Sequence, residues 1–396
     1  MIINLTEYKP EFFAADAFPY ALGELLWQSY GDKFQVDFPS PKTANQWKLT
    51  SMGWVGHIPL KKDFEIHIHP KLPLQNLFNM WAYAYQLKSF HLLDGLVNVG
   101  SLVAFYDQLA CILAQRVLTR TRQGLYLAYQ VRNGRLAFLR GQLDLQQVWQ
   151  RPLQPTLPCR YDIHTADTPD NQILAYTLSQ IARSHRCRPA VQASIRRAYR
   201  ALAGAVTPHE FQADDCYGRT YTRLNQDYQP LHALCRFFIA HTGPQQANGQ
   251  QKMLPFLVDM ARLYEQFVAA WLQTHLPNPW RIRAQERINI GQQHNGLQFD
   301  IDLVLYGRDE RPYAVLDTKY KTPTRPSNND INQIIAYAKA KGCREAVLVY
   351  PVALERPLNV TLDSLRLRSL TFGLEANLEL AGRQFLVDLG TAVAEM

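Results

Sequence analysis

The sequence predicts a mixed α/β (α+β) chain of three regions, and three observations support this prediction. Its 396 residues exceed the size at which a single hydrophobic core stops growing. Short alternating apolar runs fill the first hundred residues, and apolar residues at helical spacing follow them. Two apolar runs joined by a short polar turn then mark the last third. We expect a β-rich N-terminal domain over residues 1–95, a helical and hairpin middle region over residues 96–250, and a C-terminal domain over residues 251–396 with a central mixed sheet flanked by helices.

The first region is expected to hold strands around short helices. Gly, Pro and Asn interrupt the apolar alternation there, which predicts a helix over residues 16–27 and strands over residues 34–38, 47–50, 54–60 and 64–69. His67 and His69 alternate on one face of the last strand, and His57 is close in sequence. A His-x-His pair can bind zinc, but the sequence shows no third spaced ligand, so we interpret both as half-exposed strand residues.

The middle region is expected to be mainly helical. Apolar spacing predicts helices over residues 77–87 and 102–118 and two more within residues 171–208, separated by Pro189. We interpret the helix-spaced aromatic residues Trp81, Tyr83 and Tyr85 as core rather than as a partner surface. Asn133-Gly134 favours a tight turn, so residues 125–131 and 135–139 are expected to form a hairpin. Residues 242–252 are the best linker candidate, because they combine Gly, Pro and Asn with four glutamines.

Basic residues gather in one acid-free stretch of the middle region. The chain carries 42 Lys and Arg against 34 Asp and Glu, a net charge of +8. Between Asp170 and Glu210 there is no acidic residue. Such a stretch either contacts a polyanion or pairs with acids elsewhere in the fold. Its arginines are therefore candidates for contact with the DNA backbone: Arg183, Arg186, Arg188, Arg196, Arg197 and Arg200.

Several classes of protein are excluded by patterns that the sequence lacks. No basic segment followed by an apolar run opens the chain, and no apolar stretch reaches membrane-spanning length, so we expect a cytoplasmic protein without a membrane partner. The six cysteines include no CxxC pair, which leaves reduced and mostly buried thiols. The absence of a Gly-Lys dipeptide excludes a Walker A loop, so we expect this chain to bind no nucleotide itself.

The residues that point to chemistry lie on two strand-like runs in the last region. Residues 299–306 and 313–320 flank a six-residue polar turn, and the simplest hairpin register sets Tyr306 opposite Tyr313. Asp302 then faces Asp317, and Asp300 faces Lys319. Because side chains alternate along a strand, all four share one face of the sheet. Facing carboxylates repel each other unless a cation lies between them.

This arrangement predicts a site for Mg²⁺ or Mn²⁺. Mg²⁺ prefers one or two carboxylates with water, and the carbonyl of Thr318 could be a further ligand. The Lys319 ammonium would lie beside the metal, where it could orient water or stabilise charge on a phosphate. The alternative is a surface hairpin with incidental charges, but charges embedded in apolar runs are costly without a partner.

The spacing of Asp302, Asp317 and Lys319 resembles the PD-(D/E)xK nuclease core. Longer segments are similar to the McrC family, the nuclease subunit of McrBC-type systems that restrict modified DNA. Roughly residues 55 to 350 show this similarity in the family's order. The similar segments in the last region are Leu263-Tyr264-Glu265-Gln266-Phe267, Leu316-Asp317-Thr318-Lys319-Tyr320-Lys321 and Asn332-Gln333-Ile334-Ile335-Ala336-Tyr337-Ala338. Those upstream are Ile66-His67-Ile68-His69-Pro70-Lys71, Arg140-Gly141-Gln142-Leu143-Asp144, Leu157-Pro158-Cys159-Arg160-Tyr161-Asp162 and Asp167-Thr168-Pro169-Asp170-Asn171.

The resemblance implies roles for individual residues. It assigns metal binding to Asp302 and Asp317 and catalysis to Lys319. The family commonly has Pro before the first metal-binding Asp, whereas Ile301 precedes Asp302 here. The choice between Asp302 and Asp300 therefore stays open, although the strand register favours Asp302.

Further residues of the candidate site come from the flanking segments. Gln333 and Tyr337 would lie on the helix beside the site, where Gln333 could orient water or a phosphate, or simply pack. The apolar period of residues 256–275 predicts a helix. Glu265 is in line with apolar positions of this helix, as a candidate outer metal ligand or a partner of Arg262. We also expect Lys321 to contact DNA.

The favoured function is that of a Mg²⁺-dependent DNA endonuclease subunit that cleaves methylcytosine-containing DNA. The resemblance implies an AAA+ GTPase partner of the McrB type, which the β-rich N-terminal region would contact and stimulate. One alternative is a stand-alone repair or recombination nuclease of the same fold. Another is a non-catalytic activator of an AAA+ NTPase.

Overall fold

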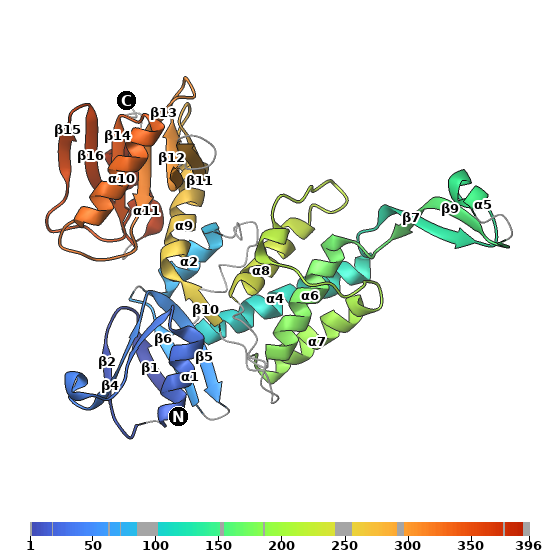
Figure 1. Ribbon diagram of the computed structural model, residues 1–396, viewed down its shortest axis with the longest axis horizontal. Coiled ribbons are helices and arrows are strands. Elements are labelled where there is room, and N and C mark those ends of the chain that lie inside the picture. Colours follow the sequence, from blue (N-terminus) through green and yellow to red (C-terminus); the bar gives the residue numbers. More distant parts are fainter. Residues whose placement is uncertain are drawn as a thin grey trace. The chain divides into compact units, whose positions relative to one another are not determined.

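The chain forms two compact units, and the first unit is built from both ends of the sequence (Figure 1). The computed structural model describes residues 2–17, 19–61, 64–71, 73–84, 102–150, 154–184, 187–241, 256–290, 297–374 and 377–390. Residues Met1–Leu102 and Leu254–Met396 make up unit 1, and Val103–Met253 make up unit 2. The expected linker at residues 242–252 and the side chain of Tyr85 lie outside the described residues.

The N-terminal part of unit 1 consists of two small sheets around one apolar core. A four-stranded sheet has the order β1-β6-β5-β10, and a three-stranded sheet has the order β2-β4-β3. Trp47, Ile58 and Ile66 are fully buried in the shared core. The expected helix and four strands are present, and the helix starts four residues later than expected: α1 (Tyr20–Tyr30), β3 (Phe34–Asp37), β4 (Gln46–Ser51), β5 (Trp54–Lys61) and β6 (Phe64–His69). Two further strands, β1 (Ile2–Thr6) and β2 (Glu11–Ala14), were not among the expected elements.

One strand of this N-terminal sheet comes from the last third of the chain. Residues 256–275 carry a helical period, but the segment begins as strand β10 (Phe256–Asp259), which pairs antiparallel with β5. Helix α9 (Met260–His275) follows, and the Asp259 side chain caps it by accepting from the Ala261 and Arg262 amides. The expectation of a helix from residue 256 is therefore wrong over its first four residues.

Helix α2 (Leu74–Ala84) packs against α9 and carries the aromatic residues that we expected in a core. Trp81 and Tyr83 are buried, which confirms the core interpretation for these two. The Asn76 amide donates to the carbonyl of Leu374 at 2.5 Å. Helix α2 therefore joins the N-terminal part of unit 1 to its C-terminal part.

The C-terminal part of unit 1 has the expected mixed sheet, with the order β11-β12-β13-β14-β16-β15. The pairs β13–β14 and β14–β16 are parallel, and the other neighbours are antiparallel. Helix α10 packs on β13 and β14, with Ile334 and Ala338 in the same core as Val304 and Val315. The elements are β11 (Arg281–Ile290), β12 (Leu297–Tyr306), β13 (Pro312–Thr318), α10 (Asn328–Lys341), β14 (Glu345–Tyr350), β15 (Asn359–Leu362), β16 (Leu365–Thr371) and α11 (Leu378–Leu389).

Unit 2 combines packed helices with a β-ribbon (Figure 1). The expected helix from residue 102 and the two helices around Pro189 are present, and Pro189 begins the second of these two. The helices are α4 (Leu102–Gln123), α5 (Leu145–Gln150), α6 (Pro169–Ser184), α7 (Pro189–Ala203) and α8 (Tyr228–His241). None of the helices that the structure describes is long and apolar enough to cross a membrane.

The expected hairpin turn at Asn133-Gly134 is wrong. Strand β7 (Ala128–Leu136) runs straight through these residues and pairs with β9 (Leu157–Thr165), so that Asn133 faces Arg160 and Gly134 faces Cys159. The short strand β8 (Gln142–Leu143) pairs with the other side of β9. Pairing along nine residues of β9 outweighs the local preference of an Asn-Gly pair for a turn.

Candidate functional site

The β12–β13 hairpin has the expected register over its central residues. Leu303 pairs with Leu316, Val304 with Val315 and Leu305 with Ala314, and the register shifts only at Tyr306, which pairs with Pro312 instead of Tyr313. The irregularity lies beside the turn and leaves the far end of the hairpin in the expected phase. Asp302 and Asp317 lie one residue beyond the Leu303–Leu316 pair, away from the turn. They therefore come to adjoining positions on the two strands.

Asp317 and Lys319 form the centre of the site. Lys319 Nζ lies 2.7 Å from Asp317 Oδ2, and the Asp317 side chain is only 2 % exposed. Burial and then repulsion from Asp302 raise the pKa of Asp317 to about 6, although Lys319 opposes this shift. Burial lowers the pKa of Lys319, but the attraction of Asp317 outweighs it and raises that pKa above its usual value. Lys319 is therefore held in its charged form.

Helix α10 fixes the position of the lysine. Lys319 Nζ donates to Gln333 Oε1 at 3.2 Å, and Gln333 Nε2 donates to the hydroxyl of Tyr337 at 2.8 Å. Ser327 caps this helix by accepting from the Asp330 amide, so that the first turn, just ahead of Gln333, is well anchored. The structure thus brings Gln333 and Tyr337 to the site through a chain of hydrogen bonds.

Asp302 and Asp300 lie in different surroundings, although they are two residues apart on β12. Asp302 Oδ2 accepts from the Thr318 amide at 2.9 Å and from the Thr318 hydroxyl at 3.1 Å. Asp300 is exposed and pairs with Arg287 of β11 at 2.7 Å, and the hydrogen bond from Arg287 lowers the pKa of Asp300. The expected pairing of Asp300 with Lys319 is therefore wrong, because β13 ends at Thr318 and Lys319 turns toward Asp317 and Gln333.

Glu265 of α9 joins the two aspartates electrostatically. Burial and repulsion from Asp302 raise the pKa of Glu265 to about 7. Its Oε1 accepts from the side-chain amide of Gln285 on β11 at 3.3 Å. Repulsion from Asp302 thus makes both Asp317 and Glu265 harder to ionise, which is the electrostatic condition that a cation relieves.

The donor set fits Mg²⁺ or Mn²⁺. Asp302, Asp317 and Glu265 offer hard carboxylate oxygens, which these ions prefer. The pKa values of Asp317 and Glu265 are raised, as expected for carboxylates that lack sufficient compensating charge. The Thr318 amide and hydroxyl serve Asp302, and the suggested use of the Thr318 carbonyl as a ligand stays a prediction.

Two residues near the site are missing from the sequence prediction. Gln285 has a φ of 51°, unusual for a residue other than Gly, in the stretch of β11 where its neighbours pair with Leu303 and Ile301. Its amide contacts Glu265, and no local sequence signal announces this conformation. Asp330, which is buried, lies 2.5 Å from Lys321 Nζ. Lys321, an expected DNA contact, therefore already holds an acidic partner.

The arginines of the acid-free stretch fall into two groups in unit 2. Arg188 pairs with the buried Asp107, with Nε 2.6 Å from Oδ2. For Arg188 the second expectation therefore holds, namely pairing with an acid elsewhere in the fold. The remaining described arginines are exposed, and within the described part of unit 2 no acidic side chain pairs with them: Arg183, Arg196, Arg197 and Arg200. Arg186 lies outside the described residues.

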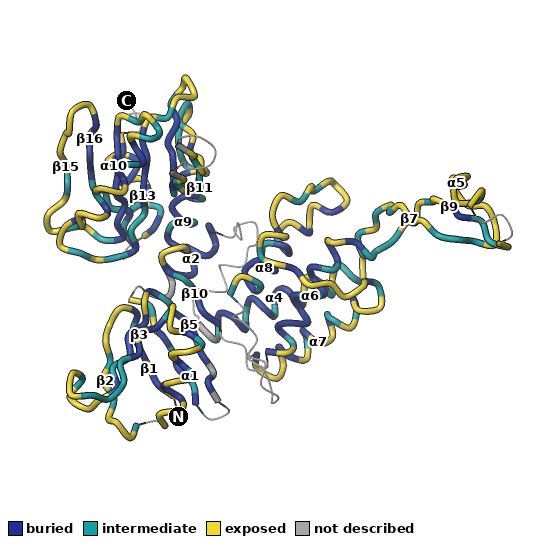
Figure 2. Tube along the Cα trace, viewed as in Figure 1, coloured by how far each residue is buried: buried dark blue, intermediate teal, exposed yellow. Residues whose placement is uncertain are grey.

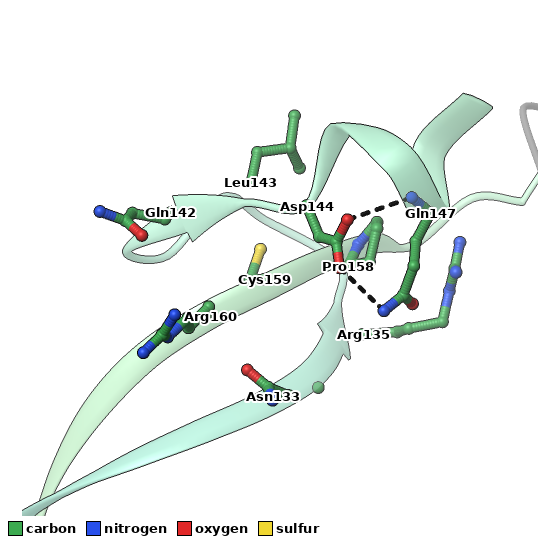
Figure 3. Close-up of a pocket in the computed structure, with 10 residues that line it drawn as sticks. Asn133, Arg135, Gln142, Leu143, Asp144, Gln147, Pro158, Cys159 and Arg160 are labelled. Atoms are coloured by element: carbon green, nitrogen blue, oxygen red, sulfur yellow. Dashed lines mark hydrogen bonds between the residues drawn. The ribbon is translucent and has the colours of Figure 1, made fainter. Parts of the chain in front are cut away.

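A separate hollow of about 570 Å³ lies on the β7-β9-β8 sheet (Figure 3). Asp144 lines it and caps α5, accepting from the Gln147 amide and from its side chain at 3.1 and 2.9 Å. Arg135 also lines it but donates to Thr156. Asp144 and Arg135 thus serve local structure, and the cluster around Asp317 is the stronger candidate site.

Comparison with known proteins gives one family and two solved structures. Residues 49–351 match the family described as McrBC 5-methylcytosine restriction system component. No curated protein matches the chain.

The first structure is a refined half-complex from a tetradecameric assembly of Thermococcus gammatolerans McrB AAA+ hexamers with bound McrC. It matches at 17 % identity and a TM-score of 0.55, over 98 % of this chain and 100 % of the other. A cryo-EM structure of the Thermococcus gammatolerans McrBC complex matches at 18 % identity and a TM-score of 0.46, over 70 % and 89 % of the two chains. At such low identity, the first match shows a shared fold.

Proposed function

Because the chain belongs to the family of McrBC 5-methylcytosine restriction system components, we propose that it is the nuclease subunit of such a system. In this proposal it is an endonuclease that needs Mg²⁺ or Mn²⁺ and hydrolyses phosphodiester bonds in methylcytosine-containing DNA. The observation that carries the proposal is the ion pair of Lys319 with the buried Asp317, beside Asp302 on the adjoining strand. A buried charge pair at the end of a hairpin is costly to keep unless it has a function.

The residues of the site would divide the work as follows. Asp302 and Asp317 would hold the metal ion, with Glu265 as an outer ligand. The ion, when bound, supplies Lewis-acid stabilisation of charge on the phosphate. Lys319 keeps its proton and offers a fixed positive charge to the scissile phosphate. Gln333 acts as a positioning residue, because its side chain holds the Lys319 ammonium on one side and Tyr337 on the other.

We propose that the exposed arginines of unit 2 bind the DNA backbone. Arg196, Arg197 and Arg200 lie within two turns of α7, and positioned cations are sufficient for phosphate contacts. Arg188 is assigned to structure instead, because it neutralises the buried Asp107.

We propose an AAA+ GTPase of the McrB type as the partner, which this chain stimulates. The first matched structure is an assembly of McrB AAA+ hexamers with bound McrC, and that assembly is the basis of the analogy. The N-terminal region is one candidate for the contact.

A second candidate for this contact is the β7-β9-β8 sheet with α5, whose trace is coloured mostly exposed or intermediate in Figure 2. Large apolar side chains stay exposed there, Trp149 at 82 % and Tyr129 at 75 %. Contiguous patches of exposed apolar side chains are typical of protein interfaces. Interface mutants in either region would decide between the two.

The experiment that tests the function is cleavage of methylated DNA by the reconstituted pair, with GTP hydrolysis by the partner measured in the same samples. Asp317→Asn should abolish cleavage and leave the stimulation of GTP hydrolysis intact. Undiminished cutting by this variant would refute the assignment of the site.

Two other outcomes would favour the alternative functions. Cutting of unmodified DNA by the isolated chain would favour a stand-alone nuclease. A wild-type pair that stimulates GTP hydrolysis and never cuts DNA would favour a non-catalytic activator.

A further inference from the structure

A second cluster of metal-binding side chains lies on the β5–β6 hairpin of the N-terminal sheet. His57 on β5 pairs directly with His67 on β6, and Glu65 lies two residues before His67. Side chains two residues apart on a strand share a face, so all three groups meet on one side of the hairpin. The sequence pattern suggested His67 and His69 as a pair, whereas the structure selects His57 and Glu65 as the neighbours of His67.

The three side chains converge on a single carboxylate oxygen. Glu65 Oε2 lies 3.1 Å from His57 Nε2 and 3.3 Å from His67 Nε2. One ligand atom from each residue lies within 4.8 Å of the other two. The imidazole rings meet edge to face with centroids 4.9 Å apart. Few side-chain rotations would be needed to aim these atoms at one central point.

The surroundings hold the cluster in place while leaving it accessible. The His57, Glu65 and His67 side chains are 13 %, 30 % and 29 % exposed. Ile58 and Ile66, the neighbouring residues on the opposite face, are fully buried in the core. Core packing on the opposite face thus holds β5 and β6 in place, and one side of the cluster faces solvent.

His69, the next residue along this face of β6, belongs to a different contact. Its Nε2 lies 3.2 Å from Asn4 Oδ1, and its side chain is exposed. The chain therefore provides its own control: a histidine on the same strand and face that is not part of the cluster.

The chemistry of the cluster differs from that of the site around Asp317. Two imidazole nitrogens and one carboxylate oxygen form a ligand set that zinc takes at about 2.0–2.2 Å, with water at a fourth position. Mg²⁺ instead prefers oxygen ligands alone. The two sites should therefore select different ions.

We propose that His57, Glu65 and His67 bind one Zn²⁺ ion on the β5–β6 hairpin. The ion cross-links the two strands, beside the point where their register shifts between Pro59 and Lys61. Its main effect is to stabilise the N-terminal sheet, independently of the nuclease site. This inference does not rest on the proposed nuclease activity.

The test is Zn²⁺ binding to the full chain, measured by calorimetry and by metal analysis after dialysis. Binding should persist in Asp317→Asn, which places it outside the carboxylate cluster. His57→Gln and His67→Gln should each weaken binding by at least about tenfold, since even residues that only orient metal ligands often contribute that much. His69→Gln should bind as the wild type does.

Thermal unfolding gives a second readout that does not depend on activity. Zn²⁺ should raise the unfolding temperature of the wild type and of His69→Gln, but not that of His67→Gln. Glu65→Gln, which changes little in volume, serves as the additional ligand variant if a histidine variant fails to fold. The proposal is overturned if the wild type shows no saturable binding, or if His69→Gln or Asp317→Asn loses as much affinity as His67→Gln.

Discussion

The hydroxyl of Tyr320 donates a hydrogen bond to Glu7 Oε1 at 2.8 Å and so joins the two ends of unit 1. Both residues are buried, and Glu7 Oε1 also accepts from the amide of Lys71 at 2.8 Å. Tyr320 directly follows Lys319. The N-terminal sheet therefore supports the segment that carries the candidate catalytic lysine.

Tyr320→Phe should destabilise the chain by about 1–3 kcal/mol, because it leaves a buried carboxylate with one donor fewer. Burial raises the pKa of Glu7, whereas Lys71 and Tyr320 oppose that shift. The ionised form of Glu7 prevails as the pH rises, so the cost of the substitution should grow with pH. Urea unfolding at several pH values measures it. Tyr313→Phe, at an exposed position, should cost little, and an equal loss in both variants would contradict the prediction.

Asp302→Asn should reduce cleavage by at least about 100-fold, as expected for a group that stabilises the reacting phosphate through a metal ion. Asp300→Asn is the matched control, since it changes the same functional group two residues away on the same strand. Asp300 is exposed beside Arg287, so cleavage should stay near the wild-type rate. Initial rates on methylated DNA with the reconstituted partner decide the matter, and the reverse order of effects would assign the metal to Asp300.

Lys319→Gln should lower the cleavage rate by about 100-fold or more, because it removes the charge that faces the phosphate. Gln333→Ala should have a smaller effect, since it only releases the lysine from its hydrogen bond. That release should move the pH profile of cleavage, which a purely structural role would not do. Lys339→Gln, an exposed position on the same helix, controls for loss of charge. Equal losses in Lys339→Gln and Lys319→Gln would remove the case for a specific role.

Unit 2 should lose stability as the pH falls below about 6.5. His232 is buried between the Asp170 carbonyl, 3.0 Å from Nε2, and the Tyr221 hydroxyl, 2.8 Å from Nδ1. Burial lowers the pKa of His232 to about 4. In the unfolded chain His232 becomes protonated near pH 6.5, whereas in the folded chain it stays neutral until about pH 4. The stability of unit 2 is therefore full above about pH 6.5 and falls as the pH decreases from about 6.5 to about 4. The full loss amounts to about 3 kcal/mol.

Hydrogen exchange of α6 and α8, corrected for the intrinsic rate at each pH, measures this loss. Protection should fall as the pH decreases from about 6.5 to about 4 in the wild type and less steeply in His232→Gln. His209→Gln removes an exposed histidine and should keep the wild-type dependence. A wild-type profile in His232→Gln would show that another group titrates.

Replacing Arg196, Arg197 and Arg200 together by Ala should weaken DNA binding uniformly across sequences. Each lost phosphate contact should reduce the slope of log affinity against log salt by about 0.9. Arg188→Ala should instead destabilise unit 2, because it leaves the buried Asp107 without its counter-charge. Fluorescence anisotropy at several salt concentrations measures binding, and an unchanged slope in the triple variant would place the DNA elsewhere.

Local patterns predicted much of the candidate site. Strand alternation and one hairpin register were sufficient to place Asp302 beside Asp317, since both depend on residues within a short segment. The separation of Asp300 from Lys319 could not be read this way, because it depends on where β13 ends and on a partner, Arg287, from another strand.

The errors and omissions arose where distant segments meet. Asn133-Gly134 has the composition of a turn, but pairing with β9 keeps it extended. Phe256 has a helical context, but an open edge of β5 recruits it as a strand. Glu65 was not recognised as a neighbour of two histidines, because the cross-strand contact of His57 with His67 brings it there. Tertiary pairing in each case overrode or extended a local preference.

The pairing of β10 with β5 has a consequence for the order in which the protein folds. During synthesis β5 emerges early, while β10 emerges only after the whole of unit 2 has been made. The N-terminal sheet must therefore wait with one edge uncovered, and such an edge invites pairing with other chains. Unit 2 consists of one continuous stretch of the chain, so it can fold before β10 is made. The pairing of β10 with β5 is thus the event that completes the N-terminal sheet and fixes the topology of unit 1.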